Sequence, residues 1–247
     1  MSAMSKTKLI WTVGVLGVVI LLGLAWQRGV IRFSPGSWQP QFSLAAITNP
    51  VPSLNRPTKI PENFPQEARP VYETNLAQLK DTLGKDPTNI TAWLDLAIYY
   101  RMVGDNEGAV QIWKYISAKH PDNGVALHNI GEYYFHTVRD YPTAESYYRR
   151  AIAVAPEMSA NYSDLFEMYQ SDYKQEGTAA TDIMREGISK VQTASSLSLL
   201  LTFGEYQAKK GDTAGARESF NRARDIAKSL GNEALVQEID AQLASLK

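Results

Sequence analysis

Residues 90–123, ITAWLDLAIYYRMVGDNEGAVQIWKYISAKHPDN, contain the pattern that decides the fold. Apolar residues recur at helical spacing in two runs, which are Trp93, Leu96, Ala97 and Tyr100, then Ala109, Trp113 and Ile116. Gly104-Asp105 separates the two runs, and Pro121 follows the second. Because glycine favours a tight turn and proline ends a helix, the stretch predicts two helices folded back on each other.

The same pattern recurs three more times, in residues 124–158, 159–196 and 197–230. Gly104 and Gly211 hold the same position in the first and fourth units, 107 residues apart, so the register is kept with small insertions. The second unit is one residue longer than the first, and we place the extra residue in the turn at 139–142. The third unit runs about four residues over.

A unit with these residues resembles the tetratricopeptide repeat (TPR), whose W-L-G-Y-A-F-A-P signature has the same period of 34 residues. The resemblance implies an all-α fold, a helical-hairpin solenoid of about four repeats with flanking helices. Residues 72–85 predict a single helix before the repeats, equivalent to the second helix of a repeat. Residues 232–247 carry one apolar stripe and predict a capping helix, since a solenoid end needs one polar side. We therefore expect the TPR domain to span 69–247.

The N-terminal region predicts a membrane segment. A short basic stretch, 1–8, precedes residues 9–26, which contain no charge. As a helix these 18 residues span about 27 Å, close to the thickness of the hydrocarbon core, and Trp11 and Trp26 lie near the two ends. The pattern favours one uncleaved transmembrane helix. The alternative is a cleaved secretory signal that ends at Gly23-Leu24-Ala25.

Residues 27–68 join the membrane segment to the repeats. Eight of the chain's twelve prolines fall from Pro35 to Pro70, and no helical period is visible there. Proline-rich chains favour extended polyproline II, so we expect a semi-rigid linker. A short basic N-terminus is usually retained inside, which predicts a cytoplasmic N-terminus and an extracytoplasmic TPR domain.

Composition narrows the possible functions. Residues 69–247 contain 19 Lys and Arg against 24 Asp and Glu, and this acidic balance argues against a nucleic-acid partner. There is no cysteine, and no phosphate-binding loop is visible. The spacing His128-x3-Glu132-x3-His136 is interpreted as a polar helix face, because a zinc site needs more ligands close by. We expect no catalytic residue, metal or cofactor, and we expect that the protein is not an enzyme.

In the TPR family the first helix of each repeat lines a concave groove that binds peptides. Carried onto this chain, the resemblance implies that the groove is lined by Asp95, Ile98, Met102, His128, Asn129, Glu132, Phe135, Asp164, Glu167 and Glu205. Family members that bind chaperone tails use lysine, asparagine and arginine at fixed groove positions. Only Asn129 matches that set, and acidic residues stand where it needs cations, so this chain is not expected to bind such tails.

The groove combines apolar spots at Ile98, Met102 and Phe135 with acidic groups, which suits a peptide that carries apolar anchors and basic residues. The sequence therefore predicts a single-pass membrane-anchored scaffold that binds a partner protein or peptide and supports assembly of a membrane-associated complex. The alternative is a stoichiometric regulatory or substrate-delivery subunit of a membrane enzyme or secretion complex.

Overall fold

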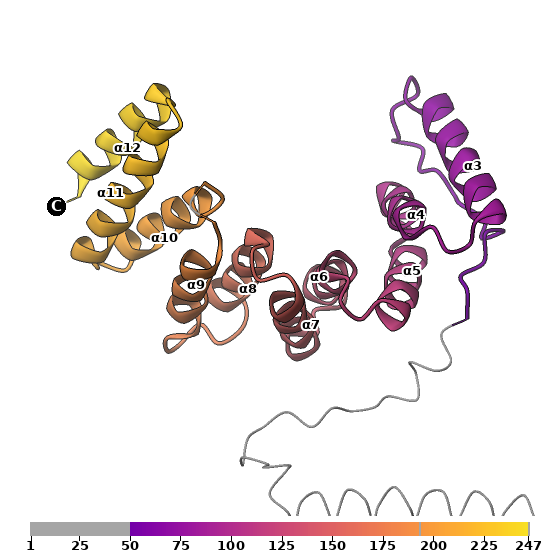
Figure 1. The fold of residues 1–247 in the computed structure, drawn as a ribbon, viewed down its shortest axis with the longest axis horizontal. Coiled ribbons are helices and arrows are strands. Elements are labelled where there is room, and N and C mark those ends of the chain that lie inside the picture. The colour runs from indigo at the N-terminus through magenta and orange to yellow at the C-terminus, as the bar shows by residue number, and fades with distance from the viewer. Residues whose placement is uncertain (1–49, 193, 247) are drawn as a thin grey trace, which may run out of the picture. The chain divides into compact units, whose positions relative to one another are not determined.

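The computed structural model describes residues 50–192 and 194–246. Within them the chain forms ten α-helices, one π-helical segment and no strand (Figure 1). The elements are α3 Arg69–Lys85, α4 Ile90–Met102, α5 Asn106–Lys119, α6 Gly124–Glu132, η1 Tyr133–Val138, α7 Tyr141–Val154, α8 Ser159–Ser171, α9 Ala179–Lys190, α10 Leu197–Lys209, α11 Thr213–Ser229 and α12 Glu233–Ser245.

The expected membrane segment at 9–26, with Trp11 and Trp26, lies outside the described residues. Among the helices that the structure describes, none combines the length and apolar character that a membrane span requires.

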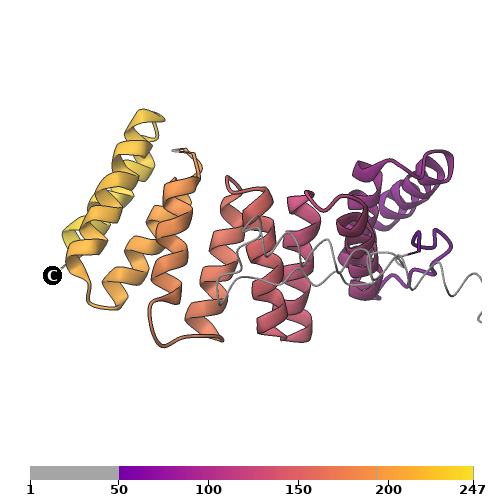
Figure 2. The same ribbon diagram turned by 60° about the horizontal axis from the view of Figure 1, so that its bottom comes forward.

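The helices pack as hairpins in chain order. The four pairs are α4–α5, α6–α7, α8–α9 and α10–α11, and each pair also contacts the next (Figures 1 and 2). In Figure 1 the first helix of each pair lies on the inner side of the row and the second on the outer side. We call the side formed by α4, α6, α8 and α10 the first-helix face. The prediction of an all-α, TPR-type helical repeat is confirmed.

The repeat signature forms the core. Three apolar clusters follow one another along the row, because each pair buries its apolar flank against its neighbours. Five of the large side chains among them have at most 2% of their surface exposed, and these are Trp93, Trp113, Tyr148, Tyr162 and Phe220.

Short polar side chains mark where the helices begin. Asn89 and Asn123 accept hydrogen bonds from backbone N–H groups in the first turns of α4 and α6. Asp105, Asp140 and Asp212 do the same at the starts of the second helices α5, α7 and α11. Each such cap is worth about 1 kcal/mol to its helix. The same aspartate cap thus begins the second helices of the first, second and fourth units, whereas α8, α9 and α10 begin without a side-chain cap.

The second unit accommodates its extra residue differently from our expectation. We placed it in the turn at 139–142, but α7 already begins at Tyr141 and the turn is short. The extra residue lies in η1, because a π-helix closes a wider ring than an α-helix and takes up one more residue. Arg139 then adopts a left-handed conformation with φ 60°, and the Asp140 N–H donates to the Tyr134 carbonyl over 3.0 Å.

The third unit holds its extra residues in the loops 172–178 and 191–196, on either side of α9. The first of these loops is fixed to α7 by Glu145. The carboxylate of Glu145 accepts from Lys174 Nζ at 2.8 and 2.9 Å, and it also accepts from the Tyr169 hydroxyl. A long connection is therefore held against the repeat.

The described part of the predicted linker folds onto the repeats. Residues 50–68, here called the N-terminal arm, place Leu54, Ile60 and Phe64 against the first apolar cluster. The Phe64 ring meets Tyr72 of α3 edge-on at 5.2 Å. This part of the linker expected at 27–68 therefore packs against the repeats. The arm covers the apolar flank of α3, which no first helix precedes within residues 50–68.

The C-terminal helix α12 packs on α11 through Val236, Ile239 and Leu243, while most of its other residues are exposed. The helix lies within 232–247, where we expected a cap. One face closes the third cluster, and the other meets solvent.

Close approach within each hairpin makes a direct prediction. A Cβ added at Gly204 of α10 would lie 2.8 Å from the Phe220 ring of α11, so Gly204→Ala should destabilise the protein by about 1–3 kcal/mol. Gly84→Ala is the matched control, because nothing lies within 4 Å of that exposed α3 position. It should be neutral or stabilise by up to about 1 kcal/mol. Urea unfolding followed by circular dichroism measures both, and equal stability of the two variants contradicts the close packing.

Candidate binding surface

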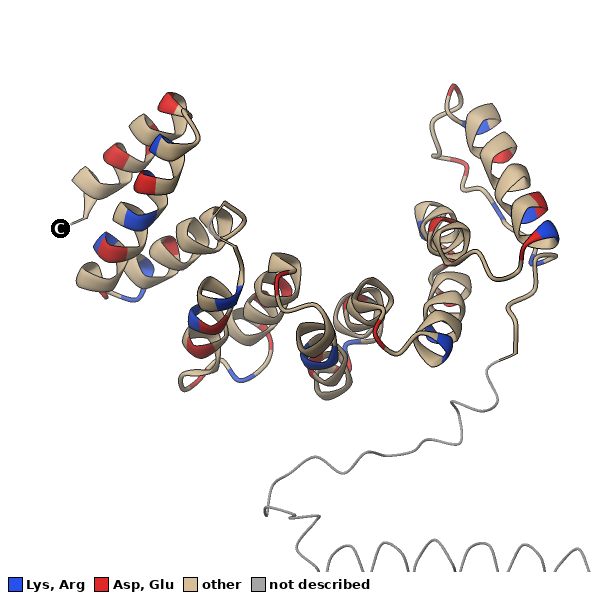
Figure 3. Cartoon of the chain, viewed as in Figure 1, with Lys and Arg blue, Asp and Glu red and all other residues tan. Residues whose placement is uncertain are grey.

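The first-helix face brings most of the predicted groove residues to one side of the row. Asp95, Ile98 and Met102 lie exposed on α4, and His128, Asn129 and Glu132 lie half-buried on α6. Asp164 is half-buried and Glu167 exposed on α8, and Glu205 is exposed on α10. Figure 3 shows acidic residues on all four of these helices.

The end of the face nearest the arm is apolar. Ile98 and Met102, four residues apart on one side of α4, are 46% and 55% exposed. Val125, at the start of α6, is also exposed. Large apolar side chains that are exposed together are unusual on a soluble surface, and they favour contact with another molecule.

The centre of the face is polar. His128 stands between α6 and α8, with Nδ1 2.9 Å from the side-chain oxygen of Asn161 and Nε2 3.5 Å from a carboxylate oxygen of Asp164. Glu132 and Glu167 lie close enough for their charges to act on Asp164. We call His128, Glu132, Asp164 and Glu167 the central polar cluster.

Negative charge on Asp164 is unfavourable in the central polar cluster. Burial is the main cause that raises the pKa of Asp164 above its ordinary value. His128 opposes this shift, whereas the negative charges of Glu132 and Glu167 add to it. Like charges held together in a partly buried place cost free energy unless a cation joins them.

Three further residues adjoin the central polar cluster, and two of them, Asn161 and Tyr148, were not identified from the sequence. Arg101 of α4 pairs with Glu132 of α6 and so joins two first helices. Asn161 is fully buried and orients His128. Tyr148 of α7 lies beneath the cluster with its ring 5.8 Å from that of His128. The sequence did not indicate that Tyr148 and Asn161 belong to a binding surface. Tyr148 occupies a core position of the repeat, and Asn161 lies in a segment with the pattern of an ordinary helix start.

Phe135 does not belong to the surface. We expected an apolar spot in the groove, but the side chain is 4% exposed and packs in the second apolar cluster, with its ring 6.2 Å from that of Tyr141. The reason is the π-helical segment, which changes the helical phase after Glu132 and turns this position inward.

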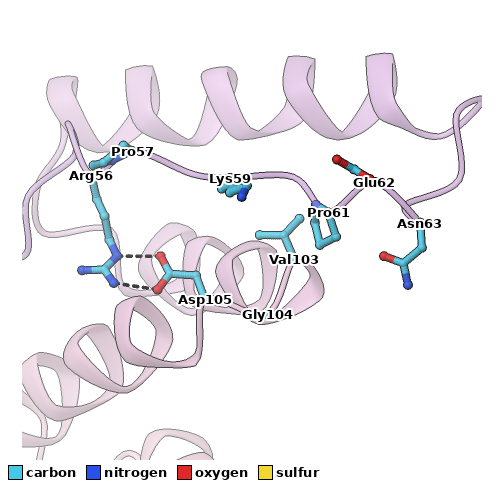
Figure 4. A pocket seen from close by; sticks show the side chains of 9 residues that line it. All are labelled: Arg56, Pro57, Lys59, Pro61, Glu62, Asn63, Val103, Gly104 and Asp105. Atoms are coloured by element: carbon cyan, nitrogen blue, oxygen red, sulfur yellow. Dashed lines mark hydrogen bonds and ion pairs between the residues drawn. The ribbon is translucent and has the colours of Figure 1, made fainter.

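The N-terminal arm makes a second polar site at the α4–α5 turn. Arg56 donates from Nε and Nη2 to the two carboxylate oxygens of Asp105, both at 2.6 Å (Figure 4). The same Asp105 accepts from the Gly108 N–H and caps α5. The pKa of Asp105 is lowered, chiefly by the hydrogen bond from Arg56. The arm is thus joined to a helix start by a bidentate pair.

A cavity of about 700 Å³ lies between the arm and this turn. The residues that line it are Arg56, Pro57, Lys59, Pro61, Glu62, Asn63, Val103, Gly104 and Asp105 (Figure 4). The cavity is wide open and its lining mixes both charges, so it does not define one ligand chemistry.

Among residues 50–192 and 194–246, no three His, Asp or Glu side chains converge so as to hold a metal ion. His136 is exposed and lies beyond the phase change in η1, so His128, Glu132 and His136 do not continue one regular helix face.

The repeat architecture with a polar first-helix face is of the TPR type. No family model matches the chain, and no curated protein matches its sequence. Among solved structures, the crystal structure of MamA is similar, with a TM-score of 0.51 and 20% sequence identity over 70% of this chain and 99% of that chain. At this identity the likeness establishes the fold, which agrees with the helical repeat described above.

The arm's ion pair makes a prediction about stability and pH. A double-mutant cycle of Arg56→Gln and Asp105→Asn should give a coupling of about 1–2 kcal/mol at neutral pH, because both side chains are mostly buried. Since the folded-state pKa of Asp105 is lowered, this contribution is present above about pH 4 and is lost as the pH falls through the folded-state value.

Urea unfolding between pH 2 and pH 7 measures this coupling. The control is Arg222→Gln, because Arg222 meets Glu218 only at 4.0 Å on the exposed side of α11 and should contribute little. An equal loss of stability in Arg56→Gln and Arg222→Gln means that the arm is not held by its ion pair.

Proposed function

We propose that this protein is a membrane-anchored scaffold that binds a partner protein through its first-helix face. The observation that carries the proposal is the exposure of Ile98, Met102 and Val125 beside the acidic residues of α6 and α8. The inner side of the helix row therefore offers apolar contact area and charge together. That combination suits a protein segment better than a small molecule.

The fold supports the same proposal. In a solenoid each helix pair contacts only its neighbours, so side chains of many units lie along one continuous face. The likeness to MamA concerns the fold, and it is consistent with a protein that binds other proteins rather than one that catalyses a reaction.

The membrane part of the proposal rests on the uncharged stretch at 9–26, bounded by Trp11 and Trp26. We propose that it anchors the chain, with the N-terminus in the cytoplasm and the repeats outside. The second candidate is a stoichiometric subunit of a membrane enzyme or secretion complex. Its support is the same face, since a permanent neighbour would cover the same apolar residues.

Site-specific photo-crosslinking in intact cells tests the face. A photoreactive amino acid at Met102 or Val125 should crosslink a partner, because both side chains are exposed on the first-helix face. The matched control is Val154 on the second helix α7, which is also exposed but belongs to the other side of the row. One product at full yield favours the stoichiometric subunit, and several weaker products favour a scaffold.

Crosslinking from Val154 that equals crosslinking from Met102 and Val125 contradicts a partner on the first-helix face. The same result also separates the two candidate functions from a non-specific contact, because non-specific contact depends on exposure alone.

Membrane attachment is tested by alkaline carbonate extraction. The full chain should remain in the membrane pellet, and deletion of 1–26 should release the repeats, because no described helix replaces the span. Protease added to intact cells, after the outer barrier is opened, should digest the repeats if they lie outside the cytoplasm. Full-length protein in the soluble fraction without detergent contradicts the anchor.

A further inference from the structure

The central polar cluster contains more negative charge than its neighbours balance. Glu132 pairs with Arg101, whereas the closest approach of His128 to Asp164 is 3.5 Å, longer than an ordinary hydrogen bond. Among the described residues no ion pair involves Glu167. Asp164 and Glu167 therefore lie close together, and the side chains whose positive charge would oppose that of Asp164 are two histidines, His128 and His136.

A second observation at the same place points to a ligand. Tyr148 is fully buried, and its hydroxyl has no hydrogen-bond partner among the described residues. The Tyr148 ring lies 5.8 Å from that of His128. Burial is the main cause that raises the pKa of Tyr148, and the negative charges of Asp164, Glu132 and Glu167 add to it, so the three carboxylates are near enough to act on the hydroxyl. A buried hydroxyl without a partner costs about 1–3 kcal/mol.

We propose that the central polar cluster receives an arginine side chain from the partner segment, an inference that rests on the proposed function. A guanidinium presents five donors in a planar fork, which is enough for Asp164, Glu167 and the oxygen of Tyr148 together. It would neutralise the excess charge and give the buried hydroxyl a partner in one step.

The surroundings favour arginine over other cations. The side chains of His128, Asp164 and Glu132 are 13%, 27% and 29% exposed, so an entering cation loses much of its water. A guanidinium is more weakly hydrated than an ammonium and tolerates this better. A metal ion is not favoured, because no three ligands converge among the residues that the structure describes.

The repeats also indicate how the partner segment runs. Glu132, Glu167 and Glu205 stand at the same position in the second, third and fourth units, where the first unit has Ile98. A segment that crosses α4, α6 and α8 in turn meets apolar contacts first and carboxylates afterwards. The partner chemistry is therefore an amphipathic segment with apolar residues at one end and arginine at the other.

The test measures binding of a synthetic 12-residue peptide, with two leucines at one end and two arginines at the other, to the full chain in nonionic detergent. A second peptide replaces each arginine with citrulline, which keeps the shape and removes the charge. Fluorescence anisotropy should show at least tenfold tighter binding of the arginine peptide, because charge-assisted pairs at a partly buried site are strong.

Variants locate this preference on the cluster. Glu167→Gln, at an exposed position, and Asp164→Asn should each reduce the preference for arginine over citrulline at least fivefold. Glu218→Gln on α11 removes the same charge from the other side of the row and should leave the preference unchanged. Tyr148→Phe should weaken arginine binding several-fold while thermal stability is kept or raised, which a merely structural hydroxyl would not do.

Equal affinity for the two peptides, no measurable binding of either, or an equal effect of Glu218→Gln overturns the inference. The proposed function is judged separately. If crosslinks from Met102 and Val125 persist in Glu167→Gln and Asp164→Asn, a partner binds the face without an arginine in the cluster. If those crosslinks are absent from the unchanged protein as well, the proposed function fails too.

Discussion

The contact between a small residue on the first helix and a large one on the second, in the first, second and fourth units, determines the rest of the structure. Cβ positions built at Gly131 and Gly204 lie 2.9 and 2.8 Å from the rings of Tyr148 and Phe220. Ala97 and Trp113 hold the same two positions in the first unit, and both are buried. Because interiors are close-packed, this pairing sets how near the helices of a hairpin approach and hence how the next pair is placed.

The third unit exchanges this small–large pair for two large side chains. Phe166 stands where the other units have glycine or alanine, and Met184 stands where they have an aromatic ring; both are buried in the second cluster. A flexible methionine adapts to a large neighbour. This exchange, together with the loops around α9, explains why the unit matches the repeat pattern less well and still packs in line.

Periodic residues made the helix pairs, the core and the cap α12 predictable, since each repeats a local rule. What the sequence did not reveal depends on contacts that have no period. Arg56 meets Asp105 across 49 residues, so a proline-rich segment that reads as a linker becomes the arm. The π-helical segment results from one inserted residue, and the sequence alone is equally compatible with an insertion in the turn. The insertion in the helix moves Phe135 from the predicted groove into the core. The sequence predicted which acidic residues line the groove. It indicated only a core role for Tyr148 and a helical position for Asn161, both of which lie beneath those acids.

The same hairpin contact links stability to the candidate surface. Tyr148 packs its ring on Gly131 and lies beneath the central polar cluster, with its ring 5.8 Å from that of His128 and its hydroxyl without a hydrogen-bond partner among the described residues. A phenylalanine would fill the core equally well without a buried, unpartnered hydroxyl, and fewer acids around Asp164 would remove the charge repulsion. Both features cost folding free energy at one point of the first-helix face, beside exposed apolar side chains. Features that are unfavourable to the folded chain alone are expected where a second molecule completes the interactions, which is why we place the partner at this point on the row.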